Sequence, residues 1–269
     1  MKYRAIFVVG TPRSGTTLAQ QALFSLAEVD SHFETHFFSN LNYRNFLRSR
    51  FYSKEVICRD VLCRLSPRDD FKVNMRDLPG AFFDVVRDRL DSLGKFIFVE
   101  KTPAHLAHIR SIEKACPVDF DLVFLHVIRS RYENVRSLYF AANEYPGHWG
   151  GKRSLACCVR RWSHDLRLHY NFLPRRGVHT FVSYEEFVSN YRSYLEKICK
   201  KLDLECSITI PTRNLKNIIS ENEDWKGKNF EEVGQGRVYD FMSPVEFERQ
   251  FRFSSSDRRM YMNVVEGCL

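Results

Sequence analysis

The sequence lacks long apolar runs, linkers and repeats. The N-terminal apolar run ends at a glycine after residue 9, whereas a membrane helix needs about 20 apolar residues. We therefore expect no membrane span and no signal peptide, and we place the protein in the cytoplasm. No Pro-, Gly- or Ser-rich linker and no repeat divides the 269 residues, so we expect one domain over residues 1–269.

Metal-site and hydrolase patterns are also missing. The eight cysteines have neither the C-x-x-C spacing of a zinc site nor the density of a small disulfide scaffold. We expect mostly reduced, buried thiols. His105 and His108 lie three residues apart, but no carboxylate or cysteine completes a ligand set, and there is no G-x-S-x-G elbow. We expect no metal, and we treat both histidines as structural.

Positive charge is in excess. Lys and Arg total 41 against 33 Asp and Glu, a formal net charge of +8. This balance favours an anionic ligand, an acidic polymer or a membrane surface without choosing among them.

Four apolar runs predict buried strands, at residues 3–9, 95–101, 120–129 and 178–184. Helical spacing of apolar residues predicts helices at 16–27 and about 132–142, helical segments through residue 202, and a helix that begins at Thr102 and Pro103, as cap and first-turn proline. Strands that alternate with helices predict an α/β fold: a mostly parallel central sheet covered on both faces. Segments 37–80 and 144–153 fit this alternation of strands and helices less well, and both are candidates for the walls of a substrate site.

The stretch "VVGTPRSGTT" has the strand, glycine loop and helix of a nucleotide-binding P-loop, yet Thr16 stands where the lysine belongs. Backbone N–H groups and the helix dipole still favour an anion there. Arg13 adds a planar donor fork for a tetrahedral oxyanion. This pattern favours a nucleotide with a shorter terminal group than ATP. The alternative is an ordinary tight turn in which Ser14 or Thr16 caps the next helix.

"TPRSGTTL" closely matches the P-[KR]-S-G-T-T loop of sulfotransferases that use 3′-phosphoadenosine 5′-phosphosulfate (PAPS), and the chain resembles that family. In "VIRSRYENVRS", Arg129 and Ser137 have the spacing of the family's 3′-phosphate pair, although Ser130 and Arg131 stand where Asp and Pro are common. The resemblance implies a three-layer α/β/α, P-loop NTPase-like fold. It also implies cofactor contacts from Arg13, Ser14, Gly15, Thr16, Thr17, Arg129 and Ser137.

Weaker matches continue in the family's order: "VEKTP", "SYEEF", "ICKKLDL" and "DWKGKN". They imply a cofactor or catalytic role for Lys101 and cofactor contacts for Tyr184 and Lys226. A solvated strand-end lysine, a core tyrosine, and a hydrophobic Trp225 anchor beside a solvated Lys226 are the alternatives. We leave Arg131 and Arg136 out of the site as solvated helix charges.

The resemblance also suggests catalytic groups. Arg13 and Lys101 would be the cations. Glu34 lies twenty-one residues after Arg13, the separation of the catalytic glutamate in the tyrosylprotein branch, so we choose Glu34 as first candidate for the base. His36 is second, because an imidazole suits a base at neutral pH. The two side chains share a face if the segment is extended.

These observations predict a PAPS-dependent sulfotransferase that acts on a hydroxyl of a carbohydrate, glycolipid or small metabolite and releases 3′-phosphoadenosine 5′-phosphate (PAP). It would need no metal and no nucleic acid. One alternative is a P-loop kinase or NTPase with a degenerate loop, for which Glu100 is the nearest acidic strand end. Another is a polyanion-binding protein that uses its charge and the aromatic, basic segment 37–53. An inactive relative that keeps the cofactor pocket is a third.

Overall fold

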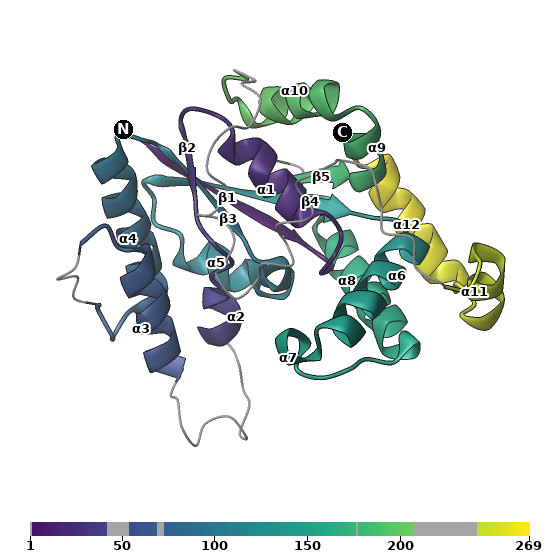
Figure 1. Ribbon diagram of the computed structural model, residues 1–269. Coiled ribbons are helices and arrows are strands. Elements are labelled where there is room, and N and C mark those ends of the chain that lie inside the picture. Colours follow the sequence, from purple (N-terminus) through teal and green to yellow (C-terminus); the bar gives the residue numbers. More distant parts are fainter. Residues whose placement is uncertain (1, 42–53, 69–72, 176, 207–240) are drawn as a thin grey trace. The chain divides into compact units, whose positions relative to one another are not determined.

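The computed structural model describes residues 2–41, 54–68, 73–175, 177–206 and 241–269 (Figure 1). These residues fall into two compact units. The first unit contains residues 2–9, 17–41, 54–68 and 73–124. The second contains residues 10–16, 125–175, 177–206 and 241–269. One domain over residues 1–269 stays a prediction.

The strands form a five-stranded sheet in the order β2-β3-β1-β4-β5. Their bounds are Tyr3–Gly10 for β1, Val29–Ser31 for β2, Ile97–Lys101 for β3, Phe120–Ile128 for β4 and His179–Ser183 for β5. The predicted α/β class and all four predicted strands are confirmed, with helices flanking a parallel sheet. Strand β2 was not predicted, because three residues that include Asp30 and Ser31 carry no apolar pattern.

In the first unit, β3 is the middle of three parallel strands. Phe98 of β3 pairs with Ala5 on one side and Asp30 on the other. The helical elements of this unit are α1 (Thr16–Phe24), α2 (Phe37–Leu41), α3 (Lys54–Leu65), α4 (Leu78–Leu93), the 3₁₀ helix η1 (Pro103–His108) and α5 (Ile109–Ala115). Figure 1 shows α3 and α4 side by side. The core is aromatic: the Phe7 ring lies about 6 Å from those of Phe38, Phe82 and Phe124.

Helix α4 has recognisable signals at both ends. The side chain of Asp77 accepts a hydrogen bond from the Gly80 N–H at 3.1 Å, which satisfies one of the free donors of the first turn. Gly94 ends the helix in a left-handed conformation with φ of 62°, where glycine carries no Cβ penalty.

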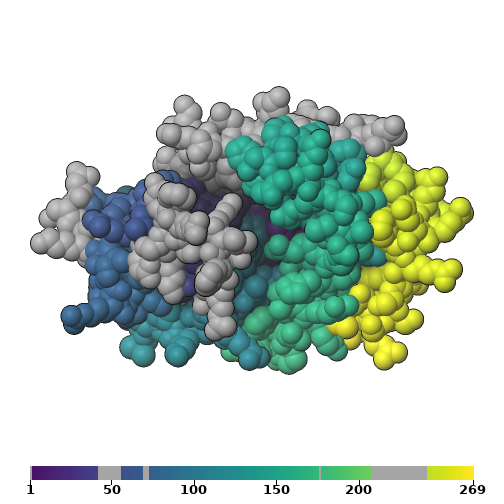
Figure 2. Space-filling view, turned by 90° about the horizontal axis from the view of Figure 1, so that it is seen from below, coloured from purple at the N-terminus to yellow at the C-terminus, as the bar shows by residue number. Residues whose placement is uncertain are grey.

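The second unit is built on α6 (Arg131–Glu144) and α8 (Leu155–Phe172), which pack against each other. Its other helices are α7 (Pro146–Trp149), α9 (Tyr184–Ser189), α10 (Tyr191–Leu202), α11 (Pro244–Gln250) and α12 (Ser255–Glu266). Helix α12 packs along α8, and the space-filling view shows the yellow C-terminal helices directly against the green part of this unit (Figure 2).

Several local predictions need correction. Helix α1 ends at Phe24 rather than residue 27. The helix after Thr102 begins as 3₁₀, and the Thr102 hydroxyl does not cap it. That hydroxyl instead accepts a hydrogen bond from the N–H of His36 and donates to Glu100. Arg131 is buried rather than solvated, since its guanidinium lies against Phe247 and Phe253.

Other expectations concern cysteines and membrane spans. All eight cysteines are free thiols, but only Cys58, Cys158 and Cys199 are buried, so the expectation of mostly buried thiols is wrong. Among the helices that the structure describes, none combines the length and the apolar character needed to cross a membrane. Most of segment 37–53, which the polyanion alternative invoked, lies outside the described residues.

Three buried histidines form a chain of hydrogen bonds in the second unit. His126 of β4 lies 2.9 Å from His169 of α8 through one ring nitrogen and 2.9 Å from His179 of β5 through the other. Burial, with lesser repulsion from the other two rings, lowers the pKa of His126 well below its usual value. Burial also lowers the pKa of His169 to about 4. The rings of His126 and His169 are therefore neutral near neutral pH.

Acid is expected to weaken the fold through this chain. Unfolded histidines, with a pKa of about 6.5, take up protons that the buried rings do not, so stability is full above that pH and falls below it. For His169 the loss at about pH 5 is on the order of 2 kcal/mol. Urea unfolding at about pH 7.5 and pH 5 would measure it. The loss of unfolding free energy between the two pH values should be smaller in His169→Leu and unchanged in the exposed control His148→Asn. Equal losses in both variants would contradict the attribution of this loss to His169.

Candidate active site

The loop from Gly10 to Thr16 needs both of its glycines. A Cβ on Gly10 would lie 2.7 Å from both the Ser14 hydroxyl oxygen and the Val127 carbonyl oxygen. Gly15 has a φ of +100°, and a Cβ there would lie 2.2 Å from the ring of Tyr184. Larger side chains at either position would therefore displace the loop, and at Gly15 they would also strain its backbone.

Side chains from the end of β4 and the first turn of α6 hold this loop through its carbonyl oxygens. Arg129 donates from Nη1 to the carbonyl of Arg13 at 3.0 Å, and Asn134 donates to the carbonyl of Pro12 at 3.3 Å. Arg13 itself has a left-handed φ of 73°. Because these two carbonyl oxygens are already bound, the loop does not turn them toward a ligand.

Arg13, Arg129 and Ser137, three of the predicted site residues, come together in the second unit. Arg13 donates from Nε to the Ser137 hydroxyl at 3.3 Å, and Arg129 binds the backbone of Arg13. Ser137 lies on α6, about two helical turns beyond Arg129. The second unit thus gathers two guanidinium groups and a hydroxyl beside a glycine loop, a donor set suited to phosphate groups.

Arg129 is oriented by aromatic residues. Its guanidinium lies 4.4 Å from the ring centroid of Tyr184, within cation–π range. The indole N–H of Trp162 donates to the Arg129 carbonyl at 3.3 Å. Glu133 lies 3.7 Å from Nη2. Tyr184, which the sequence placed at the cofactor, therefore contacts both Arg129 and the loop.

Polar atoms around the loop fit an anionic group. Within the described residues, the buried Ser14 hydroxyl, the Nε of Arg129 and the Oδ1 of Asn134 have no hydrogen-bond partner in the protein. Buried polar atoms are normally satisfied, so such atoms call for a ligand or water. Two of the three are donors, and both belong to residues of the predicted phosphate site.

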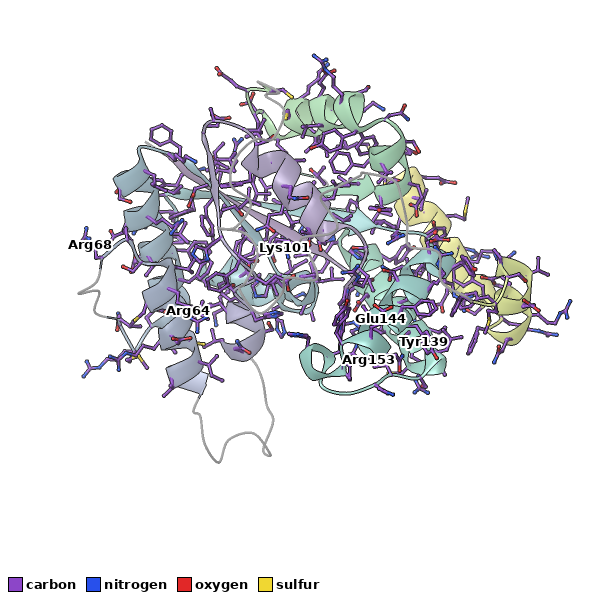
Figure 3. All side chains as sticks on the ribbon, viewed as in Figure 1. Arg64, Arg68, Lys101, Tyr139, Glu144 and Arg153 are labelled. Carbon is purple, nitrogen blue, oxygen red and sulfur yellow. The ribbon has the colours of Figure 1, made fainter. Side chains whose placement is uncertain are left out.

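The first unit contains the predicted base and lysine. Glu34 accepts a hydrogen bond from Lys101 Nζ through Oε1, and its Oε2 lies 3.3 Å from His36 Nε2. Lys101 lies at the carboxyl end of β3, where Figure 3 labels it. Its side chain is 1% exposed, whereas those of Glu34 and His36 are 14% and 51% exposed. The carboxylate bridges a buried ammonium group and an accessible imidazole.

Glu100 is fully engaged by its neighbours. Oε1 accepts from the hydroxyls of Thr35 and Thr102 at 2.8 and 2.7 Å, and Oε2 lies 2.9 Å from Nδ1 of His105. Burial opposes its ionisation, but attraction to His105 and the hydrogen bonds outweigh burial and lower the pKa of Glu100. The kinase alternative would need Glu100 near a magnesium ion, and its oxygens already have partners.

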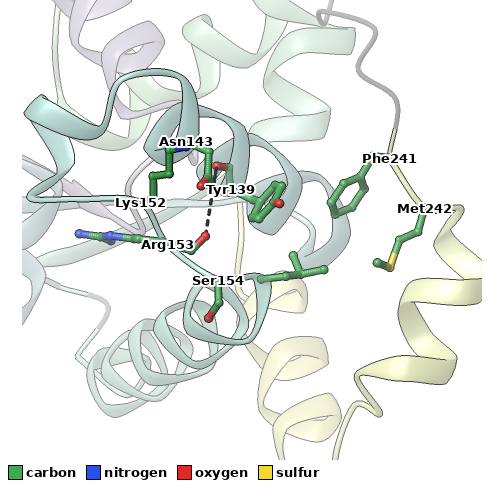
Figure 4. A pocket seen from close by; sticks show the side chains of 8 residues that line it. Tyr139, Asn143, Lys152, Arg153, Ser154, Phe241 and Met242 are labelled. Carbon is green, nitrogen blue, oxygen red and sulfur yellow. Dashed lines mark hydrogen bonds between the residues drawn. The ribbon is translucent and has the colours of Figure 1, made fainter.

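The second unit also has an open cavity of about 590 Å³ (Figure 4). Asn143 holds its wall by donating to the carbonyls of Tyr139 and Arg153 at 2.8 and 3.0 Å. The residues around it mix aromatic, aliphatic and basic side chains: Tyr139, Asn143, Lys152, Arg153, Ser154, Leu155, Phe241 and Met242. Lys152 and Arg153 come from the segment 144–153 that the sequence proposed as a substrate wall, and this segment also contains the short helix α7.

The remaining predicted cofactor residues lie either at the start of α1 or near position 225. Thr16 and Thr17 open α1, and Thr16 is buried. Lys226 and Trp225 lie outside the described residues. Sequence reasoning missed Asn134 and Trp162. Asn134 follows Arg129 by five residues and lies inside the stretch that carries the Arg129–Ser137 motif, so the sequence could have indicated it. Nothing local in α8 shows that Trp162 contacts the end of β4. Groups of three or more metal-ligating side chains do not occur in the described ranges.

A model of the sulfotransferase family matches residues 5–207, about three quarters of the chain. The chain belongs to the sulfotransferase family. It is a sulfotransferase enzyme, and the match covers the glycine loop, the Lys101 strand and the Arg129–Ser137 pair. No curated protein matches this sulfotransferase.

Solved structures share the sulfotransferase fold at low identity. The sulfotransferase domain of the Synechococcus PCC 7002 olefin synthase is 15% identical with a TM-score of 0.55, covering 98% of this chain and 94% of that one. A sulfotransferase from Alicyclobacillus acidocaldarius is 14% identical with a TM-score of 0.54, covering 98% and 96%. Mouse sulfotransferase SULT7A1, complexed with PAP, is 11% identical with a TM-score of 0.52, covering 96% and 88%. These similarities show the fold.

Gly15→Ala is expected to destabilise the sulfotransferase by about 1–3 kcal/mol from backbone strain alone, with more from the contact with Tyr184. Gly147→Ala is the matched control, because a Cβ at Gly147 meets nothing within 4 Å. Thermal unfolding of both variants measures the difference. A melting temperature of Gly15→Ala equal to that of Gly147→Ala would show that the loop does not need glycine here.

Proposed function

We propose that this sulfotransferase transfers a sulfuryl group from PAPS to an acceptor hydroxyl and releases PAP. The observation that carries the proposal is the contact of Arg13 with Ser137 and of Arg129 with the Arg13 carbonyl beside the glycine loop. PAP carries two separate phosphate groups, and this arrangement offers donors for both. The mouse structure of the same fold, which is a PAP complex, supports the choice of nucleotide.

The 5′ end of the nucleotide belongs at the loop in this proposal. Backbone N–H groups after Gly15, the start of α1 and the unpartnered Ser14 hydroxyl provide donors there. Arg13 supplies the cation that the missing P-loop lysine does not. Thr16 and Thr17 lie at the helix start, where the dipole favours negative charge.

The 3′-phosphate is assigned to Arg129 and Ser137. The Nε of Arg129 is buried without a partner, and cation–π contact with Tyr184 keeps the guanidinium in place. A planar guanidinium and a hydroxyl are donors that match phosphate oxygens. Lys226 is a further candidate from the resemblance.

Lys101 and Glu34 are assigned to the transfer step. When bound, PAPS supplies an activated sulfuryl group, whose sulfur–oxygen bond to the 5′-phosphate breaks as the bond to the acceptor oxygen forms. Arg13 and Lys101 oppose the charge that develops on the leaving phosphate. The acceptor hydroxyl loses its proton to Glu34, the first candidate, or to His36, the second. The carboxylate of Glu34 contacts both other candidates, since it accepts from Lys101 and lies 3.3 Å from His36 Nε2.

The acceptor is proposed to be a hydroxyl of a carbohydrate, glycolipid or small metabolite. The basic and aromatic residues 144–153 are the proposed specificity segment. Free thiols throughout the chain favour a reducing compartment, and we propose the cytoplasm.

Titration calorimetry with PAP tests the cofactor assignment. The Arg129→Ala, Ser137→Ala double variant should bind PAP about a hundredfold more weakly or worse, because it loses two hydrogen bonds to charged groups. An Arg160→Ala, Ser189→Ala variant makes the same chemical change at exposed positions of α8 and α9 and should bind like wild type. No PAP binding by wild type, or equal binding by both variants, would refute the assignment.

A further inference from the structure

We propose that Glu100 is a positioning residue that holds the Glu34–His36 segment in place for proton transfer. This inference rests on the proposed role of Glu34 as the base. Glu100 acts through Thr35, Thr102 and His105, whose side chains all hydrogen-bond to its carboxylate.

The network accounts for four consecutive backbone N–H groups. The N–H of Thr35 lies 3.4 Å from Oε1 of Glu100 itself. The N–H of His36 donates to the Thr102 hydroxyl at 3.1 Å, and that of Phe37 donates to the Thr35 hydroxyl at 3.2 Å. The N–H of Phe38 donates to Nε2 of His105 at 3.2 Å. These donors belong to the segment that carries Glu34 and His36 and to the first turn of α2, where N–H groups have no helical partner.

The carboxylate fixes the direction of every hydrogen bond in the network. Nε2 of His105 accepts from the N–H of Phe38, so Nδ1 is the ring nitrogen that donates to Glu100. Each threonine hydroxyl has a single proton and gives it to Glu100. Their lone pairs are therefore directed at the backbone N–H groups of His36 and Phe37.

Strand geometry places the reactive groups next to this anchor. Successive side chains of β3 point to opposite faces, so Glu100 and Lys101 diverge. Thr35 meets Glu100 while its neighbour Glu34 meets Lys101. His36 has a left-handed φ of 50°, a conformation that costs a non-glycine residue free energy and needs surrounding contacts to persist. The network supplies those contacts on both sides of His36.

Glutamine at position 100 has nearly the same shape but cannot satisfy all partners. If its oxygen faces the threonines, its amide NH₂ meets the Nδ1–H of His105. Moving that proton to Nε2 would then oppose the N–H of Phe38. If the oxygen faces His105, the threonine hydroxyls face a donor and lose the acceptor for their protons. Either orientation breaks at least one link to the segment.

Amide hydrogen exchange tests the anchoring without any acceptor. In Glu100→Gln, the amides of residues 35–38 should exchange about tenfold faster or more than in wild type. Asp165→Asn, which removes another buried carboxylate, from α8, should leave these rates within about twofold. Should Glu100→Gln fail to fold, Thr35→Val removes one link, with the buried Thr180→Val as its control. Unchanged exchange in the foldable variant would overturn the proposal.

Kinetics test the route from Glu100 to Glu34. With labelled PAPS and the fastest hydroxyl acceptor in a panel of sugars, glycolipids and phenols, Glu100→Gln should lower kcat about tenfold or more and leave the Kd for PAP within about twofold. In a Glu34→Gln background the same change should cost less than about twofold, because it acts through that base. The same fold loss in both backgrounds would contradict the positioning role. Full activity of Glu34→Gln alone would refute the base assignment, while the exchange result would still report on Glu100.

Discussion

The hydrogen bond from Arg129 to the carbonyl of Arg13 is the contact on which the second unit's site depends. It ties the end of β4 to a loop that can exist only with glycine at positions 10 and 15. The same guanidinium lies against Tyr184, whose ring fills the space beside Gly15. Loop shape, cation position and aromatic support are therefore one arrangement, in which a change at any member disturbs the others.

The first unit holds charged side chains in an environment that excludes water. Glu100 and Lys101 are adjacent and both are 1% exposed. Each has its own partners: Glu100 binds two hydroxyls and an imidazole, and Lys101 binds Glu34. Buried charges are tolerated when paired and hydrogen-bonded. The residues from Glu34 to His36, which precede α2, are thereby fixed by polar contacts rather than by regular secondary structure.

The sequence predicted four of the five strands and several of the residues that lie at the candidate site. Continuous apolar runs identified four strands, and the spacing from Arg129 to Ser137 placed both residues where they contact the loop or its backbone. Strand β2 was not predicted, because its three residues show no periodic pattern of apolar side chains. Arg131 was misread because its burial comes from Phe247 and Phe253, more than one hundred residues later. Glu100 was seen only as an acidic strand end, since its partners Thr35 and His105 become neighbours only in the fold.

The proposed function requires this sulfotransferase to recognise a nucleotide through two phosphate sites, with Arg129 and Ser137 serving the 3′-phosphate. The most direct measurement is the affinity of wild-type protein for PAP compared with adenosine 5′-phosphate, which lacks only the 3′-phosphate, with and without magnesium. We expect PAP to bind about a hundredfold more tightly and magnesium to change neither affinity. Equal affinities for the two nucleotides would contradict it.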